Sequence, residues 1–264
     1  MEVDFIGAKI TTNRLGEVRN NKFGTPMKIV KYRCADDIDV EFLDEYHYIK
    51  EHNTYSNFKS GGIRNPYDKT VLGMGYLGVG KHLTQDETQE NSRVYMCWKH
   101  MIERCYIEKH KNLHQSYYGI CTICDEWLNF QTFADWYTER EYEVNERLHL
   151  DKDIKNVGNT HYSPENCLLV PQRINELFTC RRNSSGLPTG VKPSSTGKYI
   201  SCYNGKHLGT FSTIEDAFRK YAARKEEVIK EVANEYKEII PKDVYDALIN
   251  YKVLLENDKN YKVA

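Results

Sequence analysis

The sequence lacks any long apolar run. No stretch reaches the roughly 18 to 20 apolar residues that a membrane-spanning helix needs. The first residues, Met-Glu-Val-Asp, have neither the basic segment nor the apolar segment of a secretory signal. These two absences predict a soluble, cytoplasmic protein with no membrane partner.

An excess of charge of one sign is also missing. The 264 residues include 37 Lys and Arg against 38 Asp and Glu, a formal net charge of −1. A charge this close to zero excludes a uniformly basic protein that coats nucleic acid. The hydrophobic content of 40% suffices for one large or two to three small cores, which excludes a disordered tail.

Cysteine is too sparse for a disulfide scaffold, since only eight occur in the chain. In a reducing compartment, such cysteines are free thiols or metal ligands. Cys121 and Cys124 have the two-residue spacing of zinc ligands, and Cys105 and Cys167 fall in the same predicted domain. A structural zinc site with four thiolates is therefore one hypothesis. The alternative is that these cysteines pack in the core as small apolar residues.

The chain divides into three predicted domains, at 1–84, 85–179 and 180–264. The first has short strands broken by turns and is expected to be a small β domain, whose role the sequence leaves open. The second has two helices and then the order strand, loop, strand and short helix. The third has three short strands, with a hairpin turn at Asn204-Gly205, followed by long helices. We therefore expect a multidomain chain of the α+β class.

The first predicted helix, at 93–110, has an apolar face. Its residues recur at spacings of three, one and three: Val94, Cys97, Trp98, Met101, Ile102 and Cys105. This period is that of one face of a helix packed on a core. Aromatic residues around 127–137 predict a second core helix.

Charge is unevenly distributed along the chain. Residues 180–225 hold nine Lys and Arg against two Asp and Glu, a net charge of +7, whereas 85–179 have a net charge of −6. A basic sheet of two or three strands fits the major groove of DNA, because alternate side chains form one polar face. Double-stranded DNA is the predicted partner, and a solvated basic surface without a partner is the alternative. The candidate contacts are Arg181 and Arg182 in the connector, and Lys192, Lys198, Tyr199, Ser201, Tyr203 and Lys206 in the sheet.

Four segments of this region stand in a fixed order: Gly190-Val-Lys, Gly197-Lys-Tyr-Ile, His207-Leu-Gly-Thr-Phe-Ser-Thr213 and residues 215–223. They resemble the DNA-binding domain of the plant Apetala-two and ethylene-response-factor type, which also occurs in phage homing endonucleases. The resemblance implies a three-stranded sheet that reads the major groove. Lys and Tyr stand where plant members favour Arg and Trp, so base specificity does not carry over.

A candidate metal site lies between residues 148 and 175. Asp151 is on a predicted strand, and Asn175 is on the helix expected to pack across it, so both residues can face one cation. A hard divalent cation held by a carboxylate, an amide and phosphate oxygens stabilises the charge that develops during phosphodiester hydrolysis.

The run from Leu150 to Asn175 resembles the HNH, or ββα-metal, nuclease motif, and more closely its variants in phage-encoded homing endonucleases. The resemblance implies that Asp151 and Asn175 bind Mg²⁺ or Mn²⁺, and that Asn166 ties the hairpin loop through hydrogen bonds. Residues 95–106 are similar to the helical lead-in of such phage proteins. The implied activity is a DNA endonuclease that cuts one or both strands inside a bacterial host, without a small-molecule cofactor.

The general base departs from the family. The family has a histidine directly after the aspartate, and this chain has Lys152. An unperturbed lysine has a pKa of about 10.4, so it would need a depression of about three units, or about 4 kcal/mol, to act as a base near pH 7. Lys152 is therefore expected to stabilise phosphate charge. His149 is the first candidate base, since it shares a strand face with Asp151, and His161 and Tyr162 follow.

Two other functions stay open. One is a non-catalytic, sequence-specific DNA-binding regulator that carries a degenerate HNH domain. The other is a restriction-type nuclease that acts on foreign DNA. Nicking of supercoiled DNA in the presence of Mg²⁺ or Mn²⁺ separates a nuclease from a regulator.

Overall fold

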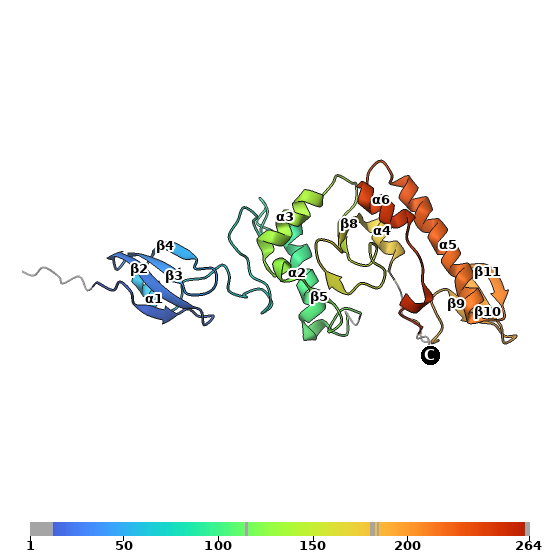
Figure 1. Cartoon of the computed structure of the whole chain (residues 1–264), viewed down its shortest axis with the longest axis horizontal. Coiled ribbons are helices and arrows are strands. Elements are labelled where there is room, and N and C mark those ends of the chain that lie inside the picture. Colours follow the sequence, from blue (N-terminus) through green and yellow to red (C-terminus); the bar gives the residue numbers. More distant parts are fainter. Residues whose placement is uncertain (1–12, 114–115, 180–182, 184, 262–264) are drawn as a thin grey trace, which may run out of the picture. The chain divides into compact units, whose positions relative to one another are not determined.

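The computed structural model describes residues 13–113, 116–179, 183 and 185–261 (Figure 1). Its helices and strands lie largely in separate stretches of the chain, as in the α+β class. The chain forms two compact units, one of Met1–Lys81 with Asn129–Gln131, and one of His82–Leu128 with Thr132–Ala264. Among the described residues, no helix combines the length and the apolar character needed to cross a bilayer.

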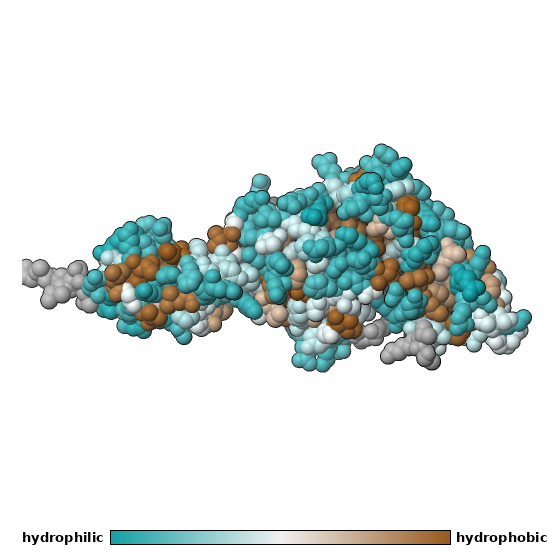
Figure 2. All heavy atoms as spheres, in the orientation of Figure 1, coloured by the Kyte–Doolittle hydropathy of each residue, from teal (hydrophilic) through white to brown (hydrophobic). Residues whose placement is uncertain are grey.

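The first unit is an antiparallel sheet with strand order β1-β2-β3-β4 and a short helix. Its elements are β1 (Val18–Asn20), β2 (Pro26–Cys34), β3 (Asp37–Phe42), β4 (Ile49–Asn53) and α1 (Tyr55–Lys59). Alternate residues of β2, namely Met27 and Ile29, are fully buried together with Phe58 of α1. Apolar side chains such as Leu15, Val18 and Phe23 stay exposed, and apolar surface is visible on this unit in Figure 2.

The second unit begins with helices that pack around two tryptophans. The elements are α2 (Arg93–Tyr106), the 3₁₀ helices η1 (Glu108–His110) and η2 (Asp125–Leu128), β5 (Thr122–Ile123) and α3 (Phe130–Arg140). The Ser92 hydroxyl caps α2 by accepting a hydrogen bond from the Tyr95 backbone N–H at 3.3 Å. The predicted apolar face of α2 is confirmed, since Trp98, Met101 and Cys105 are buried. Trp98 Nε1 donates to the Trp127 carbonyl at 2.6 Å, which joins the two helical segments.

A hairpin and a short helix follow. β6 (Leu148–Asp151) pairs antiparallel with β8 (Leu168–Pro171), so that Asp151 lies opposite Leu168. Between them, β7 (His161–Tyr162) pairs in parallel with β5. Pro171 precedes α4 (Gln172–Leu177), where its fixed φ suits the start of a helix. The predicted order of strand, loop, strand and helix is confirmed.

The last part of the chain is a second sheet backed by a long helix. The strands β9 (Val191–Pro193), β10 (Tyr199–Tyr203) and β11 (Lys206–Phe211) are antiparallel in the order β11-β10-β9. The predicted hairpin turn is confirmed, because Asn204 and Gly205 both have positive φ, at 46° and 79°. The helices α5 (Ile214–Glu235) and α6 (Lys242–Ile249) and the 3₁₀ helix η3 (Leu255–Asn257) complete the fold.

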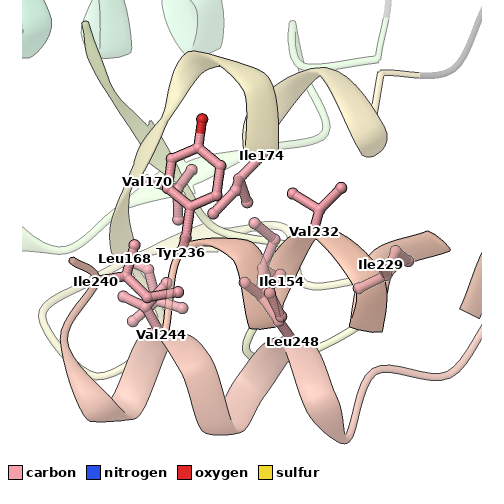
Figure 3. Packing of buried hydrophobic residues seen from close by; sticks show 11 residues of the cluster. Ile154, Leu168, Val170, Ile174, Ile229, Val232, Tyr236, Ile240, Val244 and Leu248 are labelled. Atoms are coloured by element: carbon pink, nitrogen blue, oxygen red, sulfur yellow. The ribbon is translucent and has the colours of Figure 1, made fainter. Parts of the chain in front are cut away.

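Helix α5 belongs to two cores. Its first half packs Phe218 and Tyr221 against the β9–β11 sheet. Its second half packs Val232 and Tyr236 against the hairpin, α4 and α6 (Figure 3). With 22 residues, α5 is about 33 Å long at 1.5 Å per residue. One continuous helix thus joins the sheet to the hairpin, and the segments 85–179 and 180–264, apart from Asn129–Gln131, lie in one compact unit.

Candidate active site and basic sheet

A cleft of about 1300 Å³ lies in the second unit beside the β6–β8 hairpin. The cleft is lined by His149 and Asp151 of β6, by Lys152, which follows β6, and by Asn175 of α4. His149 and Asp151 share one face of β6, because side chains alternate along a strand. The hairpin and the helix therefore bring three of the predicted site residues, His149, Asp151 and Asn175, to one cavity.

The Asp151 carboxylate is held at one oxygen and open at the other. Its Oδ1 accepts hydrogen bonds from the backbone N–H groups of Asp153 at 2.8 Å and Ile154 at 2.7 Å. Burial raises the pKa of Asp151, and the nearby Asp153 carboxylate adds to this effect. Within the described part of the chain, Oδ2 receives no hydrogen bond, so it is available as a cation ligand.

Asn175 is oriented by the core beneath α4. The preceding residue, Ile174, is fully buried against Leu168 and Val170 of β8 (Figure 3). Asn175 is half-buried and lines the cleft, and no described residue bonds to its side-chain amide. One carboxylate oxygen and one amide oxygen are hard donors of the kind that Mg²⁺ and Mn²⁺ prefer. The residues present thus fit a divalent cation with further positions left for water or phosphate.

Asn166 ties the loop between β6 and β8. Its Oδ1 accepts a hydrogen bond from Asn156 Nδ2 at 2.8 Å, and its Nδ2 donates to the His161 carbonyl at 3.4 Å. These contacts agree with the loop-tying role that the sequence predicts for this side chain. Asn166 acts on the loop and is not among the residues that line the cleft.

Lys152 directly follows β6 and lines the cleft. Its side chain is 4% exposed and donates to Asp153 Oδ1 and to the Asn159 carbonyl, both at 2.7 Å. Burial lowers the pKa of Lys152, but the Asp153 carboxylate outweighs it, so the pKa is raised overall. The ammonium group therefore stays charged and holds the loop, and its contact with phosphate stays a prediction.

The three candidate bases differ in their position relative to the cleft and in their contacts. His149 lines the cleft, and its Nε2 is buried without a hydrogen-bond partner. Burial lowers the pKa of His149, and the positive charges of Arg147 and Arg104 lower it further. His161 is not among the cleft residues, and its Nδ1 lies 2.8 Å from Thr122 Oγ1. Tyr162 lines the cleft, but burial raises its pKa. His149 is the candidate that combines position and protonation state.

The predicted zinc site is not assembled. All four cysteines are among the described residues, and no three of their sulfur atoms lie within 4.8 Å of one another. The side chains of Cys105, Cys121 and Cys167 are buried, and burial raises the pKa of the Cys105 thiol to about 12. They pack as small apolar core residues, which is the alternative that the sequence left open.

A cluster of possible metal ligands occurs instead in the first unit. The ligand atoms of Asp37, Asp39 and His52 lie within 4.8 Å of one another. Arg33 already donates to Asp37 at 2.9 Å and to Asp39 at 2.8 Å, and this contact lowers the pKa of Asp39 to about 2. Because the arginine neutralises these carboxylates, the cluster is satisfied without a cation.

The two faces of the C-terminal sheet differ from the sequence expectation. Tyr199 and Tyr203 pack toward α5, with the Tyr203 and Tyr221 ring centroids 5.9 Å apart, and Ser201 between them is fully buried. These three predicted DNA contacts therefore face the core. The opposite face includes Lys192 and Ile200, which pair across β9 and β10.

The lysines among the remaining predicted DNA contacts are solvent-exposed. Lys192, Lys198 and Lys206 are exposed on or beside the β9–β11 sheet. Arg181 and Arg182, which the sequence places in the connector, lie outside the described residues. Lys192 lies on the face away from α5, whereas Lys206 is paired with Tyr203 at the hairpin end and so lies at the edge of the α5 face.

A basic stripe of α2 also reaches the cleft. Arg93, Cys97, His100 and Arg104 all line it, at spacings of four, three and four residues. The apolar face of this helix was predicted from the sequence, but the basic stripe beside it was not. The stripe has the same helical period, because each of its residues directly precedes a residue of the apolar face.

Comparisons with protein-family models, with curated proteins and with solved structures found no match. A functional assignment therefore depends on the residues of the cleft and of the basic sheet.

Proposed function

We propose that the protein is a metal-dependent DNA endonuclease of the HNH type whose C-terminal sheet binds double-stranded target DNA. The observation that carries this proposal is the convergence of three side chains in one cleft. Asp151 offers a free carboxylate oxygen, Asn175 offers an unbonded amide, and His149 offers an unpartnered ring nitrogen. These are the groups that a hydrolytic site with one cation requires.

Each residue has a distinct part in the proposed reaction. Asp151 Oδ2 and the Asn175 amide oxygen hold Mg²⁺ or Mn²⁺, which supplies Lewis-acid stabilisation of the phosphate when bound. The His149 imidazole takes a proton from the attacking water. The new oxygen–phosphorus bond forms as the bond to the leaving oxygen breaks, and solvent protonates that oxygen. Lys152 and Asn166 hold the loop that carries Asp151.

Nicking of supercoiled plasmid tests the proposal. The purified protein is incubated with plasmid in Mg²⁺ or Mn²⁺, and the products are separated on an agarose gel. We expect open-circular or linear DNA to accumulate with time. Binding of DNA without cleavage in any divalent cation would overturn the nuclease and favour the non-catalytic regulator.

Substitution of the sheet lysines tests the DNA-binding face. The double variant Lys192→Ala with Lys198→Ala is expected to bind DNA more weakly, because both side chains are exposed on or beside the sheet. Each lost phosphate contact flattens the slope of log affinity against log salt by about 0.9. Gel-shift titrations at several salt concentrations measure both quantities.

Lys69→Ala is the control, since this exposed lysine belongs to the first unit, whereas the β9–β11 sheet belongs to the second. The control is expected to keep the wild-type affinity and slope. An unchanged slope in the double variant would move the DNA interface to another surface.

A further inference from the structure

A half-buried arginine lies at the wall of the cleft, and no acidic partner for it is found among the described residues. Arg104 of α2 lines the cleft, and its guanidinium lies over the rings of Tyr117, at 5.3 Å, and Tyr162, at 5.7 Å from the ring centroids. Its Nε is buried and has no hydrogen-bond partner. Within the residues that the structure describes, no carboxylate forms an ion pair with it.

The surroundings of Arg104 leave its charge uncompensated. Burial lowers the pKa of Arg104, but Tyr162, Tyr117, Cys97 and Cys105 raise it and the pKa is raised overall, so the guanidinium stays charged. No carboxylate is among these groups. In the same cleft, Arg173 has its own carboxylate partner, Glu235, at 2.6 Å. A buried cation without a counterion is costly, so such a group is expected where a ligand supplies the negative charge.

Arg104 is close to the loop that carries Asp151. The same two rings, Tyr117 and Tyr162, also lie beside the Lys152 ammonium, at 5.5 and 5.9 Å. Lys152 directly follows Asp151 in the chain. The guanidinium therefore lies beside the loop that follows Asp151, and its positive charge lowers the pKa of His149 in the same cleft.

A second arginine lies on the strand side. Arg147 directly precedes β6, lines the cleft and is exposed. No ion pair joins Arg147 to a residue in the described part of the chain. The planar guanidinium presents parallel N–H donors that match two oxygens of a phosphate, which a lysine cannot do. Arg104 and the exposed Arg147 thus each present a pair of parallel N–H donors to the cleft.

We propose that Arg104, with Arg147 outside it, forms the phosphate-binding site of the cleft and contacts the phosphodiester that is cut. This inference rests on the proposed nuclease function and adds to it the residue that stabilises the phosphate opposite the cation. Negative charge on the phosphate oxygens increases as water attacks, so a guanidinium held against two aromatic rings binds the transition state more strongly than the ground state. The effect falls mainly on the rate of cleavage, since many other contacts bind the DNA.

The first test measures cleavage by Arg104→Gln under single-turnover conditions at saturating protein. We expect the rate to fall by about 100-fold or more, the loss seen when one donor to a developing oxyanion is removed. The dissociation constant for plasmid DNA is expected to change by less than about threefold, because one phosphate contact among several is lost. Arg104→Lys keeps the positive charge but loses the paired N–H donors, so it should recover part of the cleavage rate.

Arg140→Gln is the matched control. Arg140 on α3 also lies over an aromatic ring, that of Trp136 at 5.1 Å, but it does not line the cleft. It is expected to cleave at the wild-type rate. An equal loss of rate in Arg104→Gln and Arg140→Gln, or no loss in either, overturns the proposal.

A second measurement does not depend on cleavage. Inorganic phosphate is titrated into the full chain, and binding is followed by calorimetry and by the thermal midpoint of unfolding. Phosphate is expected to raise the midpoint of the wild type and of Arg140→Gln, and to have no effect on Arg104→Gln. If the wild type does not cleave DNA but phosphate binding still requires Arg104, the phosphate site stands and the nuclease fails. Equal phosphate binding by the wild type, Arg104→Gln and Arg104→Lys overturns the site, even if Arg104→Gln is less stable.

Discussion

Replacing Asp151 by alanine is expected to abolish metal-dependent cleavage while DNA binding is retained. The substitution removes the only carboxylate that the account assigns to the cation, and with it the stabilisation of the attacked phosphate. A loss of about 4 kcal/mol or more in the transition state corresponds to a fall in rate of about 1000-fold. Asn175→Ala is expected to act in the same direction. Single-turnover nicking of supercoiled plasmid measures both rates.

Two controls accompany the Asp151 variant. Asp246→Ala removes a surface aspartate of α6, paired with Lys242, and should cleave at the wild-type rate. Gel-shift titration should show that Asp151→Ala binds DNA as the wild type does, since the lysines of the sheet are untouched. Cleavage by Asp151→Ala at the wild-type rate would show that the cation site lies elsewhere.

Replacing Gly190 by alanine is expected to disrupt the packing of the sheet on α5. Gly190 has a φ of +79°, and an added Cβ would lie 2.1 Å from the buried ring of Tyr221. The positive φ alone costs about 1 kcal/mol, and the overlap with the ring adds about 1 to 3 kcal/mol. Because α5 also packs on the hairpin, we expect a lower midpoint of thermal unfolding and weaker DNA binding.

Gly197→Ala separates the two contributions. Gly197 has a similar φ of +73°, but an added Cβ has no neighbour within 4 Å. It should therefore cost only the conformational part, about 1 kcal/mol. If Gly190→Ala and Gly197→Ala have equal midpoints, the contact between Gly190 and Tyr221 does not hold the sheet.

Local patterns predicted the elements that local forces determine. The Asn204-Gly205 turn, the apolar face of α2 and the order of β6, β8 and α4 follow from backbone preference and from period. The same local reasoning brought Asp151 and Asn175 together, because the helix follows β8 directly. These predictions needed no information about distant parts of the chain.

The face of β10 that packs on α5 could not be predicted from local patterns. Alternation assigns Tyr199, Ser201 and Tyr203 to one face, but it does not say which face the helix covers. The aromatic residues pack on α5, because burial of their rings stabilises the sheet more than exposure to a polar groove does. The neighbouring lysines are left exposed to solvent.

Two residues of the cleft show a related limit. Lys152 adjoins Asp151 in sequence, but its contacts with Asp153 and with the Asn159 carbonyl could not be predicted from that position. Arg104 was missed because it lies 47 positions before Asp151, and only the packing of Tyr117 and Tyr162 brings it to the cleft. Sequence distance was a poor guide in both cases.

The boundary expected at residue 179 has a similar explanation. The basic, turn-rich connector reads as a linker between two domains. The second half of α5 nevertheless supplies Ile229, Val232 and Ala233 to the core of the hairpin. The local sequence of a helix does not show that its two ends pack into different cores.

The most direct test of the account is a titration of plasmid nicking by the wild-type chain with Mg²⁺ or Mn²⁺. We expect no nicking in EDTA and a rate that rises with the cation concentration and saturates as for a single site. Full nicking in EDTA, or no nicking at any concentration of either cation, would contradict it.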